Sequence, residues 1–161
     1  MNREWKKWLK LGLLLLSIQV PAALGNSQTA FDTFKVFQGK WAIQSAGKVL
    51  PIQMTYVVGS NASIVTEQFG RELSVFYRDG SDLVMTHFCN VGNQPRLRLK
   101  EASPPGVLEF EMFDITNVKD ADAPHVQRII YRVTSEKKMD LEIIWKKGHA
   151  EESEKYTLTR I

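Results

Sequence analysis

The sequence predicts an all-β protein, a closed antiparallel meander barrel of about ten strands with a short N-terminal helix before the first strand. From Lys40 onward, apolar and polar residues alternate with the two-residue period of a strand buried on one face. Turn-forming residues interrupt this alternation at short, regular intervals, which favours antiparallel pairing of sequential strands. A sheet with one apolar face buries that face and loses its unpaired edges when it closes on itself.

Residues 1–25 have the pattern of a secretory signal peptide. A basic start is followed by an apolar run over residues 11–20 and by small residues up to Gly25. The apolar run is shorter than the roughly 20 residues that a membrane-spanning helix needs. We therefore expect cleavage after Gly25, a periplasmic or secreted protein, and no stable membrane insertion of the remaining chain. An uncleaved membrane anchor is the alternative.

The excess positive charge belongs to this leader. The chain has 21 Lys and Arg against 18 Asp and Glu, a net charge of +3. Residues 1–25 hold four of the basic side chains and one of the acidic ones, so residues 26–161 carry 17 of each. We therefore expect a single domain over 26–161 with no nucleic-acid partner. The single cysteine, Cys89, excludes an intrachain disulfide.

The helix is expected over residues 26–38. Phe31, Phe34 and Phe37 lie three apart there and form one apolar side. Gly39 is expected to end the helix, because glycine readily adopts the left-handed conformation found at helix ends.

Each strand after the helix has its own alternating run and its own turn. Met54 and Tyr56 alternate with polar neighbours in an early strand. Asp79-Gly80 is typical of a two-residue hairpin between two such runs, and later glycines and prolines mark further turns. The longest irregular stretch, 114–124, is charged and ends in proline, and could cover an opening of the barrel. The expected strands are 40–45, 51–58, 62–68, 72–78, 82–89, 95–101, 107–113, 125–134, 138–146 and 153–160.

Two segments resemble a known family. Residues 86–96 read Thr-His-Phe-Cys-x-x-Gly-Asn-Gln-Pro-Arg, which is similar to a segment of bacterial exported lipocalin-like (calycin-type) β-barrel proteins of unknown function. Gly39-Lys40-Trp41 resembles the Gly-x-Trp opening of lipocalin-like barrels, and the similarity extends over residues 31–160. The resemblance implies a barrel and bacterial export, and it implies no established reaction. Gln127 stands where the pattern has a histidine, which argues against a metal site built on His125 and a neighbour.

His87 and Cys89 are the candidate functional pair. Two residues apart on one strand, their side chains point to the same face as Leu83 and Met85, which indicates the barrel interior. One interpretation is a polar group in an apolar ligand cavity. The other is a core histidine with a structural partner beside a cysteine that packs as a small apolar residue. A Cys–His catalytic pair is disfavoured, because this spacing gives poor contact and no third group orients it.

The loop after this strand supplies further candidates. Turn geometry explains Gly92 and Pro95 but not the consecutive amides of Asn93 and Gln94, which could line the mouth of the barrel. Arg96 has two interpretations. It either forms a cross-strand ion pair with Glu109 or Glu111 of the following strand on the outer face, or it clamps an anionic ligand.

These features predict a protein that binds a small, partly apolar molecule inside the barrel. The alternatives are an enzyme using His87 as acid or base and an envelope protein-interaction module. No catalytic residue, metal or cofactor is assigned, because no spacing requires a His87–Cys89–His125 metal site or a haem on His87. The sequence leaves the oligomeric state open. The residues expected to bind the ligand are His87, Cys89, Asn93, Gln94, Arg96, Trp41 and Tyr77.

Overall fold

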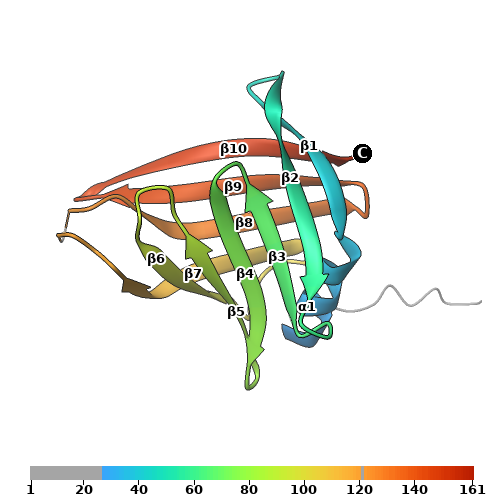
Figure 1. Cartoon of the computed structure of the whole chain (residues 1–161), viewed down its shortest axis with the longest axis horizontal. Helices are drawn as coiled ribbons and strands as arrows, with labels where there is room; N and C mark the ends of the chain where they lie inside the picture. The colour runs from blue at the N-terminus through green and yellow to red at the C-terminus, as the bar shows by residue number, and fades with distance from the viewer. Residues whose placement is uncertain (1–26, 121) are drawn as a thin grey trace, which may run out of the picture.

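The strands of this chain close into one antiparallel barrel in sequence order (Figure 1). The structure, a computed structural model, describes residues 27–120 and 122–161; the predicted signal peptide lies outside the described residues. The elements are α1 (Ser27–Val36), β1 (Gly39–Ser45), β2 (Lys48–Gly59), β3 (Ile64–Phe69), β4 (Glu72–Asp79), β5 (Asp82–Phe88), β6 (Gln94–Leu99), β7 (Val107–Thr116), β8 (His125–Ser135), β9 (Lys138–Lys147) and β10 (Ala150–Arg160).

The barrel closes between its first and last strands. β1 pairs with β10 from Trp41 opposite Arg160 to Gln44 opposite Thr157, and all other pairs join strands that are consecutive in sequence. Beyond the last pair, the Ile161 amide donates to the carbonyl of Lys40 at 3.0 Å. Closure leaves no unpaired sheet edge, and it confirms the predicted fold class.

Aromatic side chains fill the half of the barrel next to α1. Phe34 of α1 is fully buried and stacks on Phe76 of β4, with ring centroids 4.1 Å apart. It also meets Phe110 of β7 and Tyr131 of β8 edge to face, at 5.8 and 5.2 Å. A fully buried ring of this size contributes about 2 kcal/mol to folding. One helical side chain therefore joins strands from opposite sides of the barrel.

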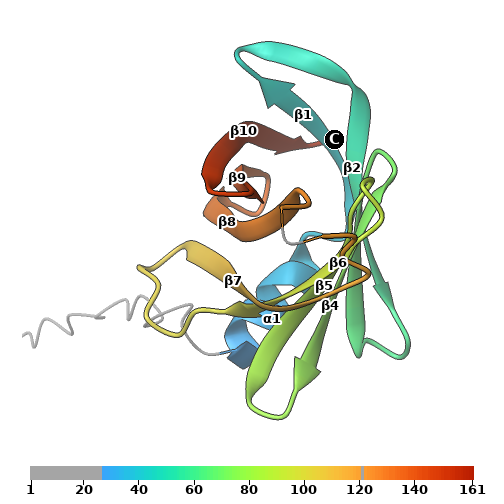
Figure 2. The same cartoon turned by 90° about the vertical axis from the view of Figure 1, so that its left-hand side faces the viewer.

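The helix α1 closes this end of the barrel. It packs against β4 and β5 (Figure 2), because Phe31 and Phe34 form its apolar side as predicted. It ends at Val36 rather than at residue 38, and Gly39 has a φ of 130° that side chains rarely adopt. The Arg160 guanidinium donates to the Val36 carbonyl at 3.1 Å, so a cation from the last strand caps the helix C-terminus.

One difference from the expected elements lies in β7. This strand continues to Thr116, whereas residues 114–124 were expected to be irregular. Asp114 pairs in register with Arg96, past a bulge between Arg96 and Leu97, and the two side chains form an ion pair at 3.1 Å. This cross-strand contact holds the charged segment in the sheet. Every strand bound lies within three residues of the expected one.

No helix among the described residues combines the length and the apolar character needed to cross a membrane.

Candidate ligand-binding site

We term the end of the barrel opposite α1 the far end. The β1–β2, β3–β4, β5–β6, β7–β8 and β9–β10 connections lie there, because strand direction alternates around a meander. A hollow of about 260 Å³ opens at its rim. Its lining residues are Val91, Pro124, Trp145, Lys147, Glu152, Ser153 and Glu154.

A chain of polar side chains runs through the interior from the packed half toward the far end. Glu67 of β3, only 5% exposed, accepts hydrogen bonds on Oε2 from the phenols of Tyr56 and Tyr131, at 2.6 and 2.8 Å. The Ser74 hydroxyl donates to Glu67 Oε1 at 3.3 Å and lies 3.0 Å from His87 Nδ1. Burial raises the pKa of Glu67 above its usual value, while the three hydroxyl donors oppose that rise. The network links the packed core to His87.

His87 lies at the end of this hydrogen-bond network, and one of its ring nitrogens has no hydrogen-bond partner among the described residues. The residue is 4% exposed, and its Nε2 atom is buried without a hydrogen-bond partner in the described part of the chain. The Glu72 Oε2 atom lies 3.8 Å away, beyond hydrogen-bond distance. Burial lowers the pKa of His87 to about 4, so the ring is neutral at neutral pH. Buried polar atoms nearly always have a partner, and Nε2 is one of three in the described residues that lack one, with Asn93 Oδ1 and Trp145 Nε1.

Cys89 shares the inner face with His87, as the two-residue spacing predicts. Burial, reinforced by the nearby charge of Glu72, raises the pKa of the thiol to about 12. The backbone of Val126 on β8 lies near the thiol and opposes this rise. A protonated, buried thiol is a poor nucleophile, so Cys89 packs rather than reacts.

The amide groups of the β5–β6 loop hydrogen-bond to nearby parts of the chain. Asn93 Nδ2 donates to the Pro124 carbonyl at 2.8 Å, which ties this loop to the start of β8. Gln94 Nε2 donates to the Gly92 carbonyl at 2.8 Å, and the Thr116 hydroxyl donates to Gln94 Oε1 at 2.9 Å. These contacts give both amides a structural use that turn geometry alone did not reveal. Asn93 Oδ1 remains buried without a partner among the described residues.

Two candidate residues lie on the outer face of the barrel, away from His87. The Tyr77 hydroxyl lies 3.2 Å from the Thr86 hydroxyl, on the opposite side of the sheet from the buried Phe76. Arg96 sits beside them and forms its ion pair with Asp114. Arg96 therefore forms a cross-strand ion pair on the outer face, but with Asp114 rather than with Glu109 or Glu111, and neither Arg96 nor Tyr77 lies with the interior groups.

Trp41 lies inside the barrel but in the packed half. It is fully buried, and its indole N–H donates to the Phe37 carbonyl at 2.8 Å. His125 does not join His87; its Nδ1 lies 2.9 Å from the Ala123 carbonyl. Within residues 27–120 and 122–161, no three His, Cys, Asp or Glu side chains form a group suited to a metal ion.

Glu67, Glu72 and Tyr131 are site residues that the sequence analysis did not single out. A signal for Glu67 was present, because it occupies an inward position of its strand between Val65 and Phe69. A buried carboxylate needs hydrogen-bond donors, and two tyrosines supply them: Tyr56, which lies opposite Glu67 on the neighbouring strand β2, and Tyr131 of β8. Only the contact with Tyr131, 64 positions away in sequence, depends on the closed barrel and is not visible in local patterns.

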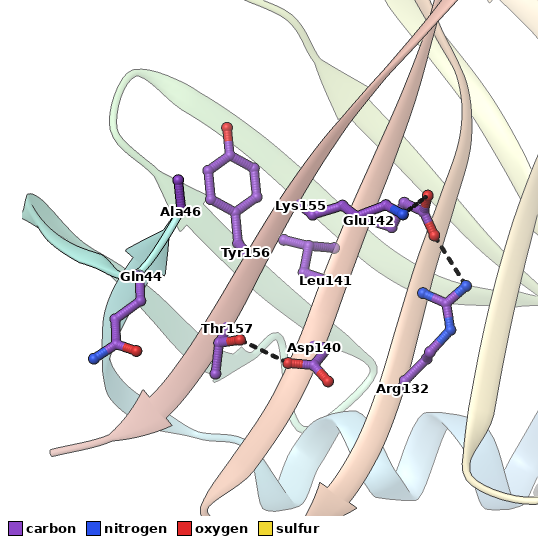
Figure 3. A pocket seen from close by; sticks show the side chains of 10 residues that line it. Gln44, Ala46, Arg132, Asp140, Leu141, Glu142, Lys155, Tyr156 and Thr157 are labelled. Carbon is purple, nitrogen blue, oxygen red and sulfur yellow. Dashed lines mark hydrogen bonds and ion pairs between the residues drawn. The ribbon is translucent and has the colours of Figure 1, made fainter.

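A second hollow, of about 470 Å³, lies along β8, β9 and β10 (Figure 3). Its charged groups pair with one another: Arg132 and Lys155 reach Glu142 at 2.9 and 3.4 Å. The Thr157 hydroxyl donates to Asp140 at 2.8 Å. Because these groups satisfy each other, this groove makes a weaker ligand site than the far end. Its lining residues are Gln44, Ala46, Gly47, Arg132, Asp140, Leu141, Glu142, Lys155, Tyr156 and Thr157.

Comparison with solved structures finds the same architecture elsewhere. The crystal structure of Rv2717c from M. tuberculosis matches with a TM-score of 0.54 over 82% of this chain and 97% of the other, at 16% sequence identity. At that identity the similarity establishes the fold alone. No protein-family model matches the chain, and the search of curated proteins also returned no match.

Proposed function

We propose that this chain is an exported, lipocalin-like barrel protein that binds a small, partly apolar molecule at the far end of its barrel, with His87 as the polar anchor. The observation that carries this proposal is the buried Nε2 atom of His87, which has no partner among the described residues. A buried polar atom left unsatisfied costs about 1–3 kcal/mol, which a ligand group could recover. The hollow of about 260 Å³ at the rim of the far end lies just below the usual range of ligand pockets, so it suits a small molecule.

The electrostatics favour binding over catalysis. A histidine with a pKa of about 4 is a weak base at neutral pH, and general acid–base groups work best near the working pH. The Cys89 thiol, with its pKa raised to about 12, supplies no thiolate nucleophile. The interior therefore offers hydrogen bonding and apolar contact more readily than proton transfer.

Native mass spectrometry of the protein purified from its own host tests the proposal. The wild-type protein is expected to retain a small molecule that organic solvent releases, and His87→Gln is expected to lose most of it. His149→Gln, an exposed histidine in the β9–β10 turn, is the matched control and should retain the molecule. A wild-type protein that carries no small molecule and acquires none from a host metabolite extract would contradict the proposal.

The proposed export rests on the pattern of residues 1–25. N-terminal sequencing of the protein recovered from the periplasm or medium is expected to begin at Asn26. A protein that retains Met1 would instead favour the uncleaved anchor.

An enzyme remains the second candidate, because a carboxylate, a hydroxyl and a histidine in series resemble a proton relay. Glu67, Ser74 and His87 form that series at 3.3 and 3.0 Å. Under this alternative, His87→Ala abolishes turnover of any substrate found while the protein stays folded. A variant that merely unfolds would show that the histidine is structural.

A further inference from the structure

The direction of the interior hydrogen-bond chain follows from the number of available hydrogens. The Tyr56 and Tyr131 phenols both donate to one oxygen of Glu67, at 2.6 and 2.8 Å, and the shorter bond lies in the range typical of an ionised carboxylate. An ionised carboxylate only accepts, so the single hydrogen of Ser74 goes to Glu67 Oε1. Ser74 must then accept from His87, which places the ring hydrogen on Nδ1. The Nε2 atom is left as an acceptor with a free lone pair.

A second acceptor faces this lone pair. Glu72 Oε2 lies 3.8 Å from His87 Nε2, while the other oxygen of Glu72 accepts from the Asn90 amide at 3.3 Å. Neither a neutral Nε2 acceptor nor a carboxylate oxygen can donate to the other. One nitrogen carrying several hydrogens can donate to both, because N–H···O and N–H···N bonds of roughly 2.9 Å reach two acceptors at this separation. An ammonium group has three such hydrogens.

The surrounding charges favour a cation. Glu154, which lines the hollow, is close enough to Glu72 for its charge to raise the pKa of that carboxyl, although burial of Glu72 is the larger cause. Glu152 lines the same hollow, and Lys147 is the cation among its lining residues. Carboxylates that oppose one another's ionisation are stabilised when a cation arrives between them.

The same region offers apolar surface for the body of a ligand. Trp145 lines the hollow, and the rings of Phe69 and Tyr156 meet edge to face with centroids 5.2 Å apart. Aromatic faces also attract cations directly. Nε2 itself has no surface open to solvent, so entry of a ligand requires movement of the side chains around it.

We propose that the far end of the barrel binds a protonated amine with an apolar body, whose ammonium nitrogen donates to both His87 Nε2 and the Glu72 carboxylate. This inference rests on the proposed function and names the class of its ligand. Glu67 acts as a positioning residue. Its charge makes Ser74 donate to it, so Ser74 accepts from His87 Nδ1 and the Nε2 atom is left as an acceptor.

The first test determines where the His87 ring carries its hydrogen. Long-range proton–nitrogen spectra of the labelled protein are expected to show a protonated Nδ1 and a bare Nε2 at neutral pH. In Glu67→Gln the new amide can donate to Ser74, so the serine hydrogen turns toward His87 and the ring hydrogen moves to Nε2. Ser74→Ala breaks the same chain by a second route. A wild-type ring protonated on Nε2 would overturn the inference.

The second test compares three probes with one apolar body and different polar groups. Phenethylamine, phenethyl alcohol and hydrocinnamate are titrated into the protein by calorimetry. The amine is expected to bind at least tenfold more tightly than the alcohol and the carboxylate. Glu72→Gln and Glu67→Gln should both remove this preference, whereas Glu136→Gln, an exposed carboxylate in the β8–β9 turn, should keep it.

The outcomes separate this inference from the proposed function. Equal or stronger binding of the alcohol or carboxylate overturns the amine proposal, as does an amine preference that survives Glu72→Gln. Failure of the amine to bind overturns it as well. If the protein nevertheless retains a small molecule that His87→Gln loses, the proposed function stands with a different ligand class.

Discussion

Replacing His87 should change how the stability of the fold depends on pH. Burial lowers the folded-state pKa of His87 from 6.5 to about 4, so the folded protein disfavours the protonated ring. Between these two values the unfolded chain binds more protons at this site than the folded protein does. The contribution of the neutral His87 ring to the free energy of unfolding is therefore fully present above pH 6.5, and it is lost as the pH falls toward 4.

The size of this loss follows from the pKa difference. At roughly 1.4 kcal/mol per pKa unit, a shift from 6.5 to about 4 corresponds to about 3 kcal/mol of unfolding free energy. The groups that face His87 are Glu72 and Cys89 directly and Glu67 through Ser74. Both carboxyls have raised pKa values and act in the opposite direction, but they are present in variant and wild type alike. Their effect cancels to first order when the two proteins are compared.

Urea unfolding of wild type and His87→Gln across this pH range measures the difference. The wild-type unfolding free energy should fall by about 3 kcal/mol more than that of the variant between near-neutral pH and pH 4. His149→Gln, which changes an exposed histidine, should follow the wild-type curve. Parallel curves for wild type and His87→Gln would refute the assignment of His87 as a buried neutral ring.

Three further substitutions or treatments test other parts of the structure. Phe34→Ala, which removes the ring that joins both sides of the packed half, should lower the unfolding free energy by about 3–5 kcal/mol; a loss below about 1 kcal/mol would contradict the packing described. Tyr131→Phe removes one of the two phenols on Glu67 and should cost about 1–3 kcal/mol, with a further rise in the pKa of Glu67 measured by carboxyl NMR; an unchanged titration would count against the network. Cys89, with a pKa of about 12, should react with a thiol reagent at mildly alkaline pH only as fast as the protein opens, and equal rates in native and unfolded protein would show that the thiol is exposed.

Local patterns were sufficient to predict the strands and the inner face of β5. Alternation places Met85, His87 and Cys89 together because side chains two apart share one face of a strand, and all three are buried in the barrel. The same period-two argument did not give the orientation of Tyr77, which was expected among the ligand-binding residues but faces outward, because Ser74 and Phe76 face inward. Its run carries apolar residues at successive positions, and only the pairing of β4 with β5 decides that Phe76 faces inward.

The Tyr131 contact of the interior network could not be predicted, because it forms only after closure, whereas Glu67 lies opposite Tyr56 and Ser74 on neighbouring strands. Glu67 and Tyr131 are separated by 64 positions in sequence yet lie 2.8 Å apart. Their contact depends on strands that face one another across the barrel, and no local periodicity records that relation. The filling of one end by Phe34 likewise depends on where α1 docks.

Nitrogen NMR of the His87 ring, recorded before and after the retained small molecule is removed, tests most directly whether this histidine anchors a ligand. Binding is predicted to shift the Nε2 resonance of His87 strongly while the resonances of the exposed His149 stay in place. A His87 ring whose Nε2 resonance is the same with and without the bound molecule would contradict the account.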